Sequence, residues 1–266
     1  MQVVDADAAV KLVNSGDRVY VHEAAMAPTS LIEALVRRAD ELNDVEIMHL
    51  HTEVPAPYVS PDYAGRLRLN ALFVGGNVRS AVNAGDADYT PVFLSEIPSL
   101  MSDGTLPVDV ALVQLSSPDL HGYCRLGTSI ACARAAVDSA KVVIAELNPR
   151  VPRTMGNSAV HVSRITAAVE VDRPLPVHEP PVISETERRI GDNVASIIPN
   201  GATLQVGIGS IPAAVLRALP NHEDLGVHTE MFTDELIDLV ESGVVTNRLK
   251  TRFQGRIVTS FASGTQ

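Results

Sequence analysis

The chain has 266 residues, of which 45% are hydrophobic, so it is long enough to bury one large core or two smaller ones. Its formal net charge of -11, unbroken by any run of Lys and Arg, argues against nucleic acid as a partner. No apolar run approaches the roughly 20 residues that a membrane span needs, and the acidic start MQVVDADAAV is unlike a signal peptide, so we expect a cytoplasmic protein without a membrane partner.

Short β-branched runs alternate with amphipathic runs along the whole chain, which predicts an α/β protein with a largely parallel sheet. In the first two thirds, strands are expected at 18–22, 45–50, 67–74, 108–115 and 141–147, and helices at 30–42 and 129–140. In the last third, strands are expected at 202–208 and 255–261, and helices at 185–198, 211–219 and 234–243.

Two of these helices have a start that fits the capping box, in which a Ser and a Glu three residues later satisfy main-chain N–H groups. The pairs are Ser30 with Glu33 and Ser184 with Glu187. Between them lies the proline-rich stretch 171–185, VDRPLPVHEPPVISE, which cannot form a helix or a central strand. We place the domain boundary in this stretch, which gives domains 1–178 and 179–266.

The start of each predicted domain follows the same order of elements. Residues 9–38 and 193–219 both fit the order helix, glycine turn, strand, loop with proline and helix, and each copy then continues to a tripeptide HTE. The copies differ in the loop after the strand, which is HEAAMAP in the first and GIGSIP in the second. We therefore expect two related, open α/β domains with different loops.

The GIGSIP loop of the second copy is a candidate anion site. Glycines let the main chain approach a ligand, and a strand-to-helix turn directs free N–H groups toward it. Pro212 is favoured in the first turn of the helix behind the loop. Two alternatives stay open: a tight turn that only packs, and a dinucleotide site, which Pro212 disfavours because it replaces the third glycine of G-x-G-x-x-G.

Each HTE copy contains a glutamate, Glu53 or Glu230. Only Glu230 has the glycine loop as a neighbour, and we expect it after the second strand, at the carboxyl edge where open α/β sheets bind ligands. A glutamate is anionic at neutral pH and can act as a nucleophile without a base. Taken alone, a glutamate at a strand end is more often a solvated or capping residue. The loop and the duplication make Glu230 the candidate nucleophile.

No metal site is expected. His49, His51 and Glu53 alternate and would share one face of a strand, as metal ligands can, but a polar strand edge is the simpler interpretation. Cys124 and Cys132 match neither a structural zinc site nor a disulfide framework, so we expect two buried thiols.

Five stretches carry a resemblance to a known family. They are 76–100, 109–127, 147–165, 201–216 and 225–236, and they include the sequences GNVRSAVNAGDADY, SSPDLHGYCRLG, GIGSIP and HTEMFTDEL. Together they resemble the acetyl-CoA hydrolase/transferase family, most closely its 4-hydroxybutyrate and butyrate CoA-transferase branch. The resemblance implies two related, open, largely parallel-sheet domains of the CoA-transferase (NagB/RpiA-like) type.

In that family a glutamate attacks an acyl-CoA, and the reaction passes through an acyl-glutamyl anhydride to a glutamyl-CoA thioester. By motif match the resemblance implies Glu230 as the nucleophile and a CoA-binding loop of Gly207, Ile208, Gly209, Ser210 and Ile211. It implies coenzyme A as a co-substrate and no permanently bound cofactor. The expected partners are an acyl-CoA, a small carboxylic acid, and a second copy of the chain or a C-terminal segment.

The chain departs from the family pattern in three places. Glu235 stands where relatives usually have a glycine, and Arg125 stands where a small residue is common. The chain also stops at SFASGTQ, where relatives continue through another glycine-rich segment. We therefore expect the second domain, 179–266, to be truncated, and residues 1–266 alone to turn over little acyl-CoA.

The predicted function is CoA transfer between a short-chain acyl-CoA, of the 4-hydroxybutyryl or butyryl type, and a carboxylate such as acetate. One alternative is hydrolysis of the acyl-CoA by the same glutamate. The other is a module that binds CoA without turnover. A nicotinamide dehydrogenase is the most remote interpretation.

Overall fold

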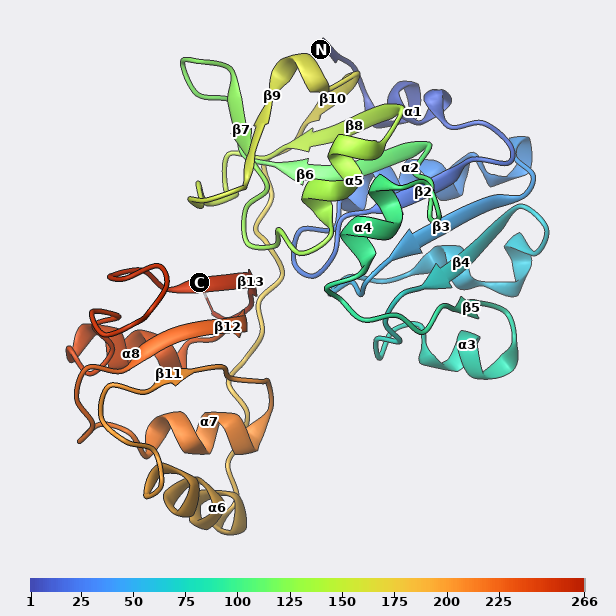
Figure 1. Ribbon diagram of the computed structural model, residues 1–266. Coiled ribbons are helices and arrows are strands. Elements are labelled where there is room, and N and C mark those ends of the chain that lie inside the picture. Colours follow the sequence, from blue (N-terminus) through green and yellow to red (C-terminus); the bar gives the residue numbers. More distant parts are fainter. Residues whose placement is uncertain (266) are drawn as a thin grey trace. The chain divides into compact units, whose positions relative to one another are not determined.

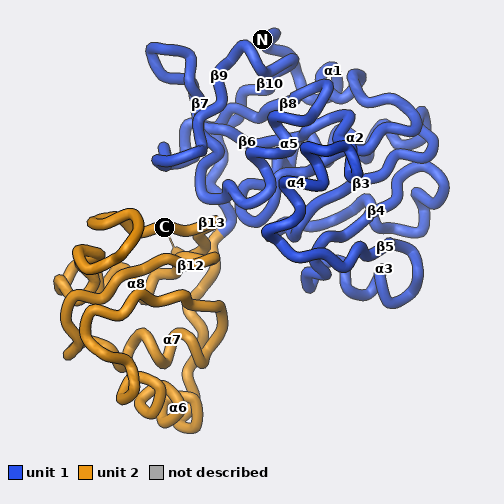
Figure 2. The backbone as a smooth tube through the Cα atoms, in the orientation of Figure 1, with its two compact units in different colours: residues 1–176 blue, residues 177–266 orange. Residues whose placement is uncertain are grey.

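The computed structural model describes residues 1–265 and has two compact units, Met1–Pro176 and Val177–Gln266 (Figure 2). The border between them falls inside the proline-rich stretch 171–185. Each unit has a parallel sheet of its own. Within the described residues, no helix combines the length and the apolar character that a membrane crossing requires.

The first unit is built on an eight-stranded parallel sheet in the order β1-β10-β8-β6-β2-β3-β4-β5 (Figure 1). The strands are β1 Gln2–Val3, β2 Arg18–Val21, β3 Val45–His49, β4 Leu67–Ala71, β5 Asp88–Tyr89, β6 Val110–Leu115, β8 Val142–Leu147 and β10 Ala167–Glu170. The chain runs outward from β2 to β5 and restarts at β6 on the other side of β2, so the strand order reverses between β2 and β6. This sheet confirms the predicted α/β class and the five strands expected in this part of the chain.

Apolar side chains cover both faces of this sheet, as a parallel sheet requires. Val19 and Val21 of β2 belong to one core, and Tyr20 between them belongs to the other. The helices are α1 Ala6–Ala9, α2 Thr29–Arg37, α3 Arg79–Ala84, α4 Ile97–Ser102 and α5 Ala133–Ser139. An antiparallel pair, β7 Tyr123–Arg125 with β9 Ala159–His161, and five short 3-10 turns complete the unit.

The capping box predicted at Ser30 is wrong. Helix α2 begins at Thr29, and its N-cap is Pro28, whose side chain offers no acceptor. The main-chain N–H of Leu31 instead donates to Glu146 Oε1 at 3.1 Å. Glu146 lies in β8, far away in the sequence, so a buried carboxylate from the sheet satisfies the helix start in place of a local side chain.

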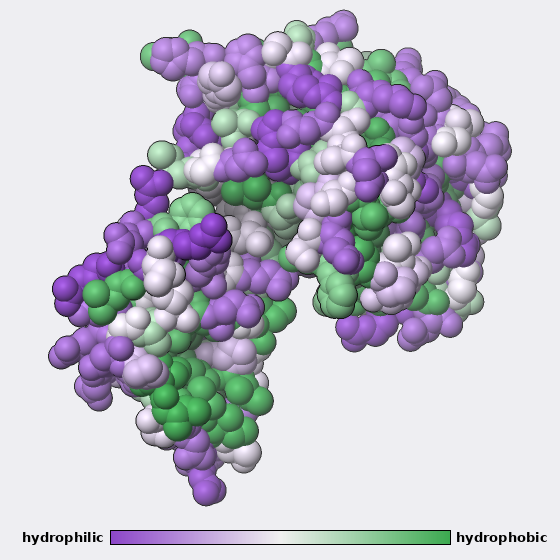
Figure 3. Space-filling model, in the orientation of Figure 1, coloured by the Kyte–Doolittle hydropathy of each residue, from purple (hydrophilic) through white to green (hydrophobic). Residues whose placement is uncertain are grey.

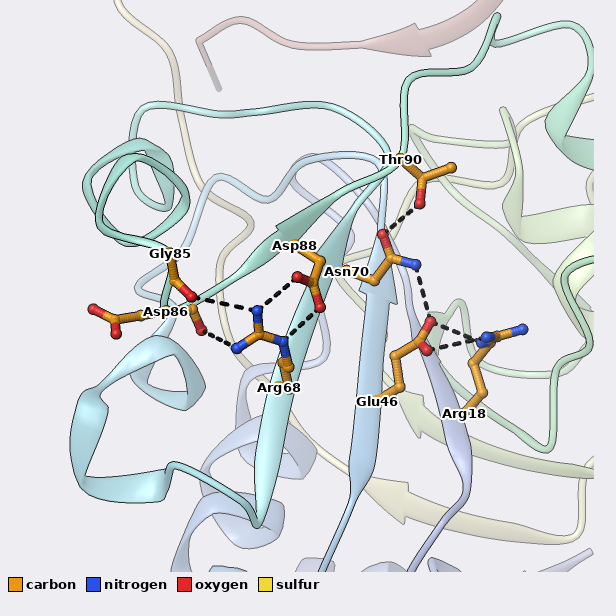
Figure 4. Close-up of polar contacts among 8 residues, drawn as sticks. All are labelled: Arg18, Glu46, Arg68, Asn70, Gly85, Asp86, Asp88 and Thr90. Atoms are coloured by element: carbon orange, nitrogen blue, oxygen red, sulfur yellow. Dashed lines mark hydrogen bonds and ion pairs between the residues drawn. The ribbon is translucent and has the colours of Figure 1, made fainter.

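A row of polar side chains crosses the strands β2 to β5 on one face of the sheet (Figure 4). Arg18 Nε donates to Glu46 Oε1 at 2.7 Å, and Asn70 Nδ2 donates to the same oxygen at 3.0 Å. Arg68 donates to both oxygens of Asp88, through Nε at 2.5 Å and Nη2 at 2.6 Å. Because these polar groups are paired across neighbouring strands, they fix the strand register and leave none of the five side chains without a partner.

The second unit has a three-stranded parallel sheet in the order β11-β12-β13. Its strands are β11 Thr203–Leu204, β12 Gly226–Phe232 and β13 Val258–Ala262, and its helices are α6 Glu185–Ala195, α7 Ser210–Arg217 and α8 Glu235–Glu241. The three predicted helices are confirmed, and so is the capping box, in which Ser184 N donates to Glu187 Oε2 at 2.7 Å. The strand expected at 202–208 is shorter than predicted, because its main-chain pairing with β12 ends at Leu204.

Candidate active site

Both units contain a β–α–β segment with a parallel strand pair, β2–α2–β3 in the first and β11–α7–β12 in the second. The two HTE copies lie differently on these segments. His51–Glu53 follow β3, which ends at His49, whereas His228–Glu230 lie inside β12. The sequence predicted no strand at residues 226–232 and placed Glu230 after a strand, and both points are corrected: Glu230 lies inside β12, which pairs with β13 as far as Phe232.

The loop of the first copy is closed. Residues 22–28 are all buried, and the fully buried Glu23 is held by three donors. Its Oε1 accepts from Ser129 Oγ at 3.0 Å and from the main-chain N–H of Cys132 at 3.3 Å, and its Oε2 accepts from the Tyr20 hydroxyl. This loop therefore offers no surface to a ligand.

Burial dominates the titration of Glu23 and raises its pKa from 4.5 to about 7. A raised pKa means that the folded state binds the proton more tightly than the unfolded state does. Glu23 therefore contributes fully to the free energy of unfolding below pH 4.5, and this contribution is lost as the pH rises through 7. Burial acts in the opposite direction on its neighbour His22, whose pKa is lowered to about 4, so the contribution of His22 is lost as the pH falls from 6.5 to 4.

We expect Glu23→Gln to remove the contribution of Glu23, since Gln resembles the protonated acid and the Tyr20 hydroxyl can accept from its amide. Between pH 4.5 and 7, wild type should lose about 3 kcal/mol of stability relative to the variant. His22 is common to both proteins and cancels in the difference. Urea unfolding of both proteins across this range measures it, and a pH-independent difference would contradict the assignment.

The loop of the second copy is open. Gly207, Ile208, Gly209 and Ile211 are exposed, and Ser210 is half-buried. Gly209 is the N-cap of α7 and has φ +104° and ψ -178°, a conformation that residues with a Cβ do not adopt without strain. Apart from Gly209 itself and its two sequence neighbours, no atom lies within 4 Å of the place where its Cβ would stand. The main chain here is therefore accessible to a ligand.

A pocket of the second unit lies at this loop. Gly207, Ile208 and Gly209 of the loop line it. The rest of the lining comes from the end of β12, the start of α8, the segment before α6, α7 and the segment after β13, namely Met231, Thr233, Asp234, Glu235, 178–181, Ala213, Ser263 and Gly264. Glu230 does not line this pocket. Exposure alternates along β12, with His228 and Glu230 exposed and Thr229 and Met231 buried, so the Glu230 carboxylate lies on the other face of the strand.

An apolar groove adjoins the same loop. Its lining comes from α6, α7 and the segment between β11 and α7, with Val194, Ile198, Val206, Ile211 and Val215 among its residues. In Figure 3 this part of the second unit, over α6 and α7, is the apolar area in green. Gly207 lines both the pocket and the groove. The loop therefore borders both a pocket whose lining includes charged side chains and an apolar groove.

Two side chains outside the loop fix its position. Glu187 of α6 accepts from Ser210 Oγ as well as from its capping partner Ser184, and these hydrogen bonds lower the pKa of Glu187 to about 2. Thr229 of β12 bonds to both main-chain groups of Val206, directly before Gly207. The sequence had identified Glu187 as a capping residue only and had assigned no role to Thr229.

Glu235 and Arg125, at which the sequence departs from the family pattern, lie in different units. Glu235 is the first residue of α8, with its side chain 8% exposed, and Arg217 Nη2 of α7 lies 3.6 Å from its Oε1. It thus joins the two helices beside the pocket. Arg125 lies in β7 of the first unit, where its main-chain N–H donates to Ser116 Oγ at 3.0 Å.

The alternating His49, His51 and Glu53 do not form a metal site. His49 is buried, and its Nε2 lies 2.8 Å from the Tyr58 hydroxyl, while His51 and Glu53 lie beyond the end of the strand. Residues 1–265 contain no group of three or more His, Cys, Asp or Glu side chains that could hold a metal ion. The two thiols of Cys124 and Cys132 are buried, as expected.

Comparison with known proteins places the chain in a family. Residues 1–182 match the acetyl-CoA hydrolase/transferase N-terminal domain. The chain is 46% identical, over its whole length, to a 4-hydroxybutyrate coenzyme A transferase of Clostridium kluyveri, of which it spans 62%. It is 41% identical to a succinyl-CoA:acetate/propanoyl-CoA:succinate CoA transferase of Fasciola hepatica, with 98% of the chain aligned to 55% of that protein.

Solved structures agree with this result. A 4-hydroxybutyrate CoA-transferase from Porphyromonas gingivalis superimposes with a TM-score of 0.87 at 36% identity, over 99% of this chain and 63% of that one. RipA from Yersinia pestis superimposes with a TM-score of 0.93 at 30% identity, over 99% of this chain and 64% of that one. The chain thus spans less than two thirds of these relatives, and it belongs to the acetyl-CoA hydrolase/transferase family.

Proposed function

We propose that the protein is a CoA-transferase that forms a glutamyl-CoA thioester on Glu230. The observation that carries the proposal is the contrast between the two β–α–β copies. The first copy has a buried loop, while the second presents an open glycine loop that Thr229 ties to the strand of an exposed Glu230. The relatives named as CoA transferases support the same activity.

The proposed reaction begins when a Glu230 carboxylate oxygen attacks the thioester carbonyl of an acyl-CoA. The carbon–sulfur bond breaks, CoA leaves as a thiolate, and an acyl-glutamyl anhydride remains. The thiolate then attacks the glutamyl carbonyl and releases the first acid as a carboxylate. A second carboxylate reverses these steps and carries CoA away. No step requires a general base, because both nucleophiles are already anionic.

The loop of Gly207, Ile208, Gly209, Ser210 and Ile211 is the proposed CoA-binding element. Its accessible main chain at the start of α7 provides N–H groups that can bind a CoA oxygen or the oxyanion that forms during each attack. By analogy with the relatives, the proposed substrates are a 4-hydroxybutyryl- or butyryl-type acyl-CoA and a carboxylate such as acetate. A second copy of the chain or a C-terminal segment as a partner stays a prediction.

The test is product analysis in the full-length protein, with butyryl-CoA supplied with and without acetate. We expect acetyl-CoA and butyrate to form in equal amounts only when acetate is present, because the thioester on Glu230 needs an acceptor acid. Consumption of butyryl-CoA without acetate, with free CoA as product, would instead identify the hydrolase of the same family. Calorimetric binding of CoA without any exchange would identify a binding module and contradict the proposal.

A further inference from the structure

Thr229 is the residue directly before Glu230, and its side chain is buried, with 4% of the residue exposed. Its hydroxyl oxygen accepts from the Val206 N–H at 2.9 Å and donates to the Val206 carbonyl at 2.7 Å. One hydroxyl thus pairs both main-chain groups of Val206.

This contact lies where the main-chain ladder stops. The pairing of β11 with β12 ends at Leu204 opposite Val227, and the chain then leaves the sheet toward Gly207. Val206 is a half-buried residue beyond the last paired residue of β11, so its main-chain groups bond to the Thr229 hydroxyl instead of to the ladder. The hydroxyl therefore replaces the missing ladder at the last residue before the glycine loop.

In the first copy of the repeat, main-chain hydrogen bonds take the place of the threonine hydroxyl. Its loop is joined to the HTE segment by main-chain bonds, from Ala24 N to His51 O at 2.8 Å and from Glu53 N to Ala24 O at 3.2 Å. Thr52, which corresponds to Thr229, accepts from Asn77 Nδ2 at 3.0 Å instead. A threonine hydroxyl bonds to the strand-to-helix loop segment only in the copy whose loop is open.

We propose that Thr229 is a positioning residue that holds the glycine loop in register with Glu230. Thr229 is adjacent to Glu230 in the chain, and Val206 is adjacent to Gly207, so the two hydrogen bonds fix the loop relative to the nucleophile. Thr229 faces away from Glu230 on the strand and touches no reacting atom. This inference rests on the proposed transfer reaction, because the register matters only if Glu230 reacts with a thioester held at the loop.

The test is Thr229→Val, which keeps the shape of the side chain and removes the hydroxyl. We expect the rate of Glu230-CoA thioester formation in the full-length protein to fall roughly 10- to 100-fold, since a misplaced binding element typically costs a factor of this order. Thr229→Ser retains the hydroxyl and should restore most of the rate. The Val206 amide should exchange with solvent faster in Thr229→Val and at the wild-type rate in Thr229→Ser.

The matched control is Thr246→Val. Thr246 lies in the same unit, and its hydroxyl donates to Asp224 Oδ1 at 3.0 Å, without contact to the glycine loop. It should lower stability without slowing thioester formation. Wild-type kinetics in Thr229→Val, or an equal loss of rate in Thr246→Val, would overturn the inference. If wild type itself forms no thioester, the proposed function fails, and that failure is seen without any variant.

Discussion

Glu230→Gln is expected to abolish CoA exchange, by a factor on the order of 10⁴ or more, because the amide cannot form the anhydride or the thioester. The Glu230 side chain is exposed on β12, so the amide should not disturb the fold. Glu53→Gln is the matched control from the other HTE copy. Its main-chain bond to Ala24 does not depend on the side chain, and we expect it to keep its activity.

The covalent adduct gives the same prediction a direct readout. Full-length protein that receives an acyl-CoA without an acceptor acid should accumulate the thioester, and borohydride should reduce it and inactivate the enzyme irreversibly. Peptide mapping should find the reduced residue at position 230 in wild type and in Glu53→Gln, and no adduct in Glu230→Gln. A modified peptide containing Glu53, or an active enzyme without any modified glutamate, would contradict the assignment.

The strands that the sequence predicted are those whose own side chains have a strong strand preference. The runs of β2, β6 and β8 were identified, because both faces of these strands are largely buried and apolar residues, many of them β-branched, fill most positions. The strand β10 was missed. Its sequence AAVE at 167–170 has little strand preference, and it is a strand because it pairs with β8 along its whole length.

Hydrogen bonds between residues close in the sequence could likewise be predicted, whereas those between distant residues could not. The capping box at Ser184 was predictable, because both partners lie within one helical turn. The cap of α2 was not, since its acceptor Glu146 is 115 residues away from Leu31. The open loop at Gly209 could be predicted from its glycines, but the role of Thr229 required the structure, because nothing local shows that β11 ends at Leu204.

Gly209→Val is expected to lower the rate of transfer roughly 10²- to 10³-fold, the loss typical of a missing oxyanion donor. The branched side chain would project into the space in front of the loop that a ligand would occupy, and φ +104° would force the main chain to shift. CoA affinity should fall together with the rate, since the proposed N–H donors move away from both CoA and the thioester oxygen.

Backbone strain alone could lower activity by destabilising the second unit, at a cost of about 1–3 kcal/mol, and a second glycine separates the two causes. Gly243 also has a positive φ, +77°, and apart from its sequence neighbours no atom lies within 4 Å of its Cβ position. It follows α8 and is not among the residues that line the pocket. Gly243→Val should therefore lower thermal stability and leave CoA affinity unchanged. Equal losses of rate in the two variants, or unchanged rate and CoA affinity in Gly209→Val, would show that the loop does not bind CoA.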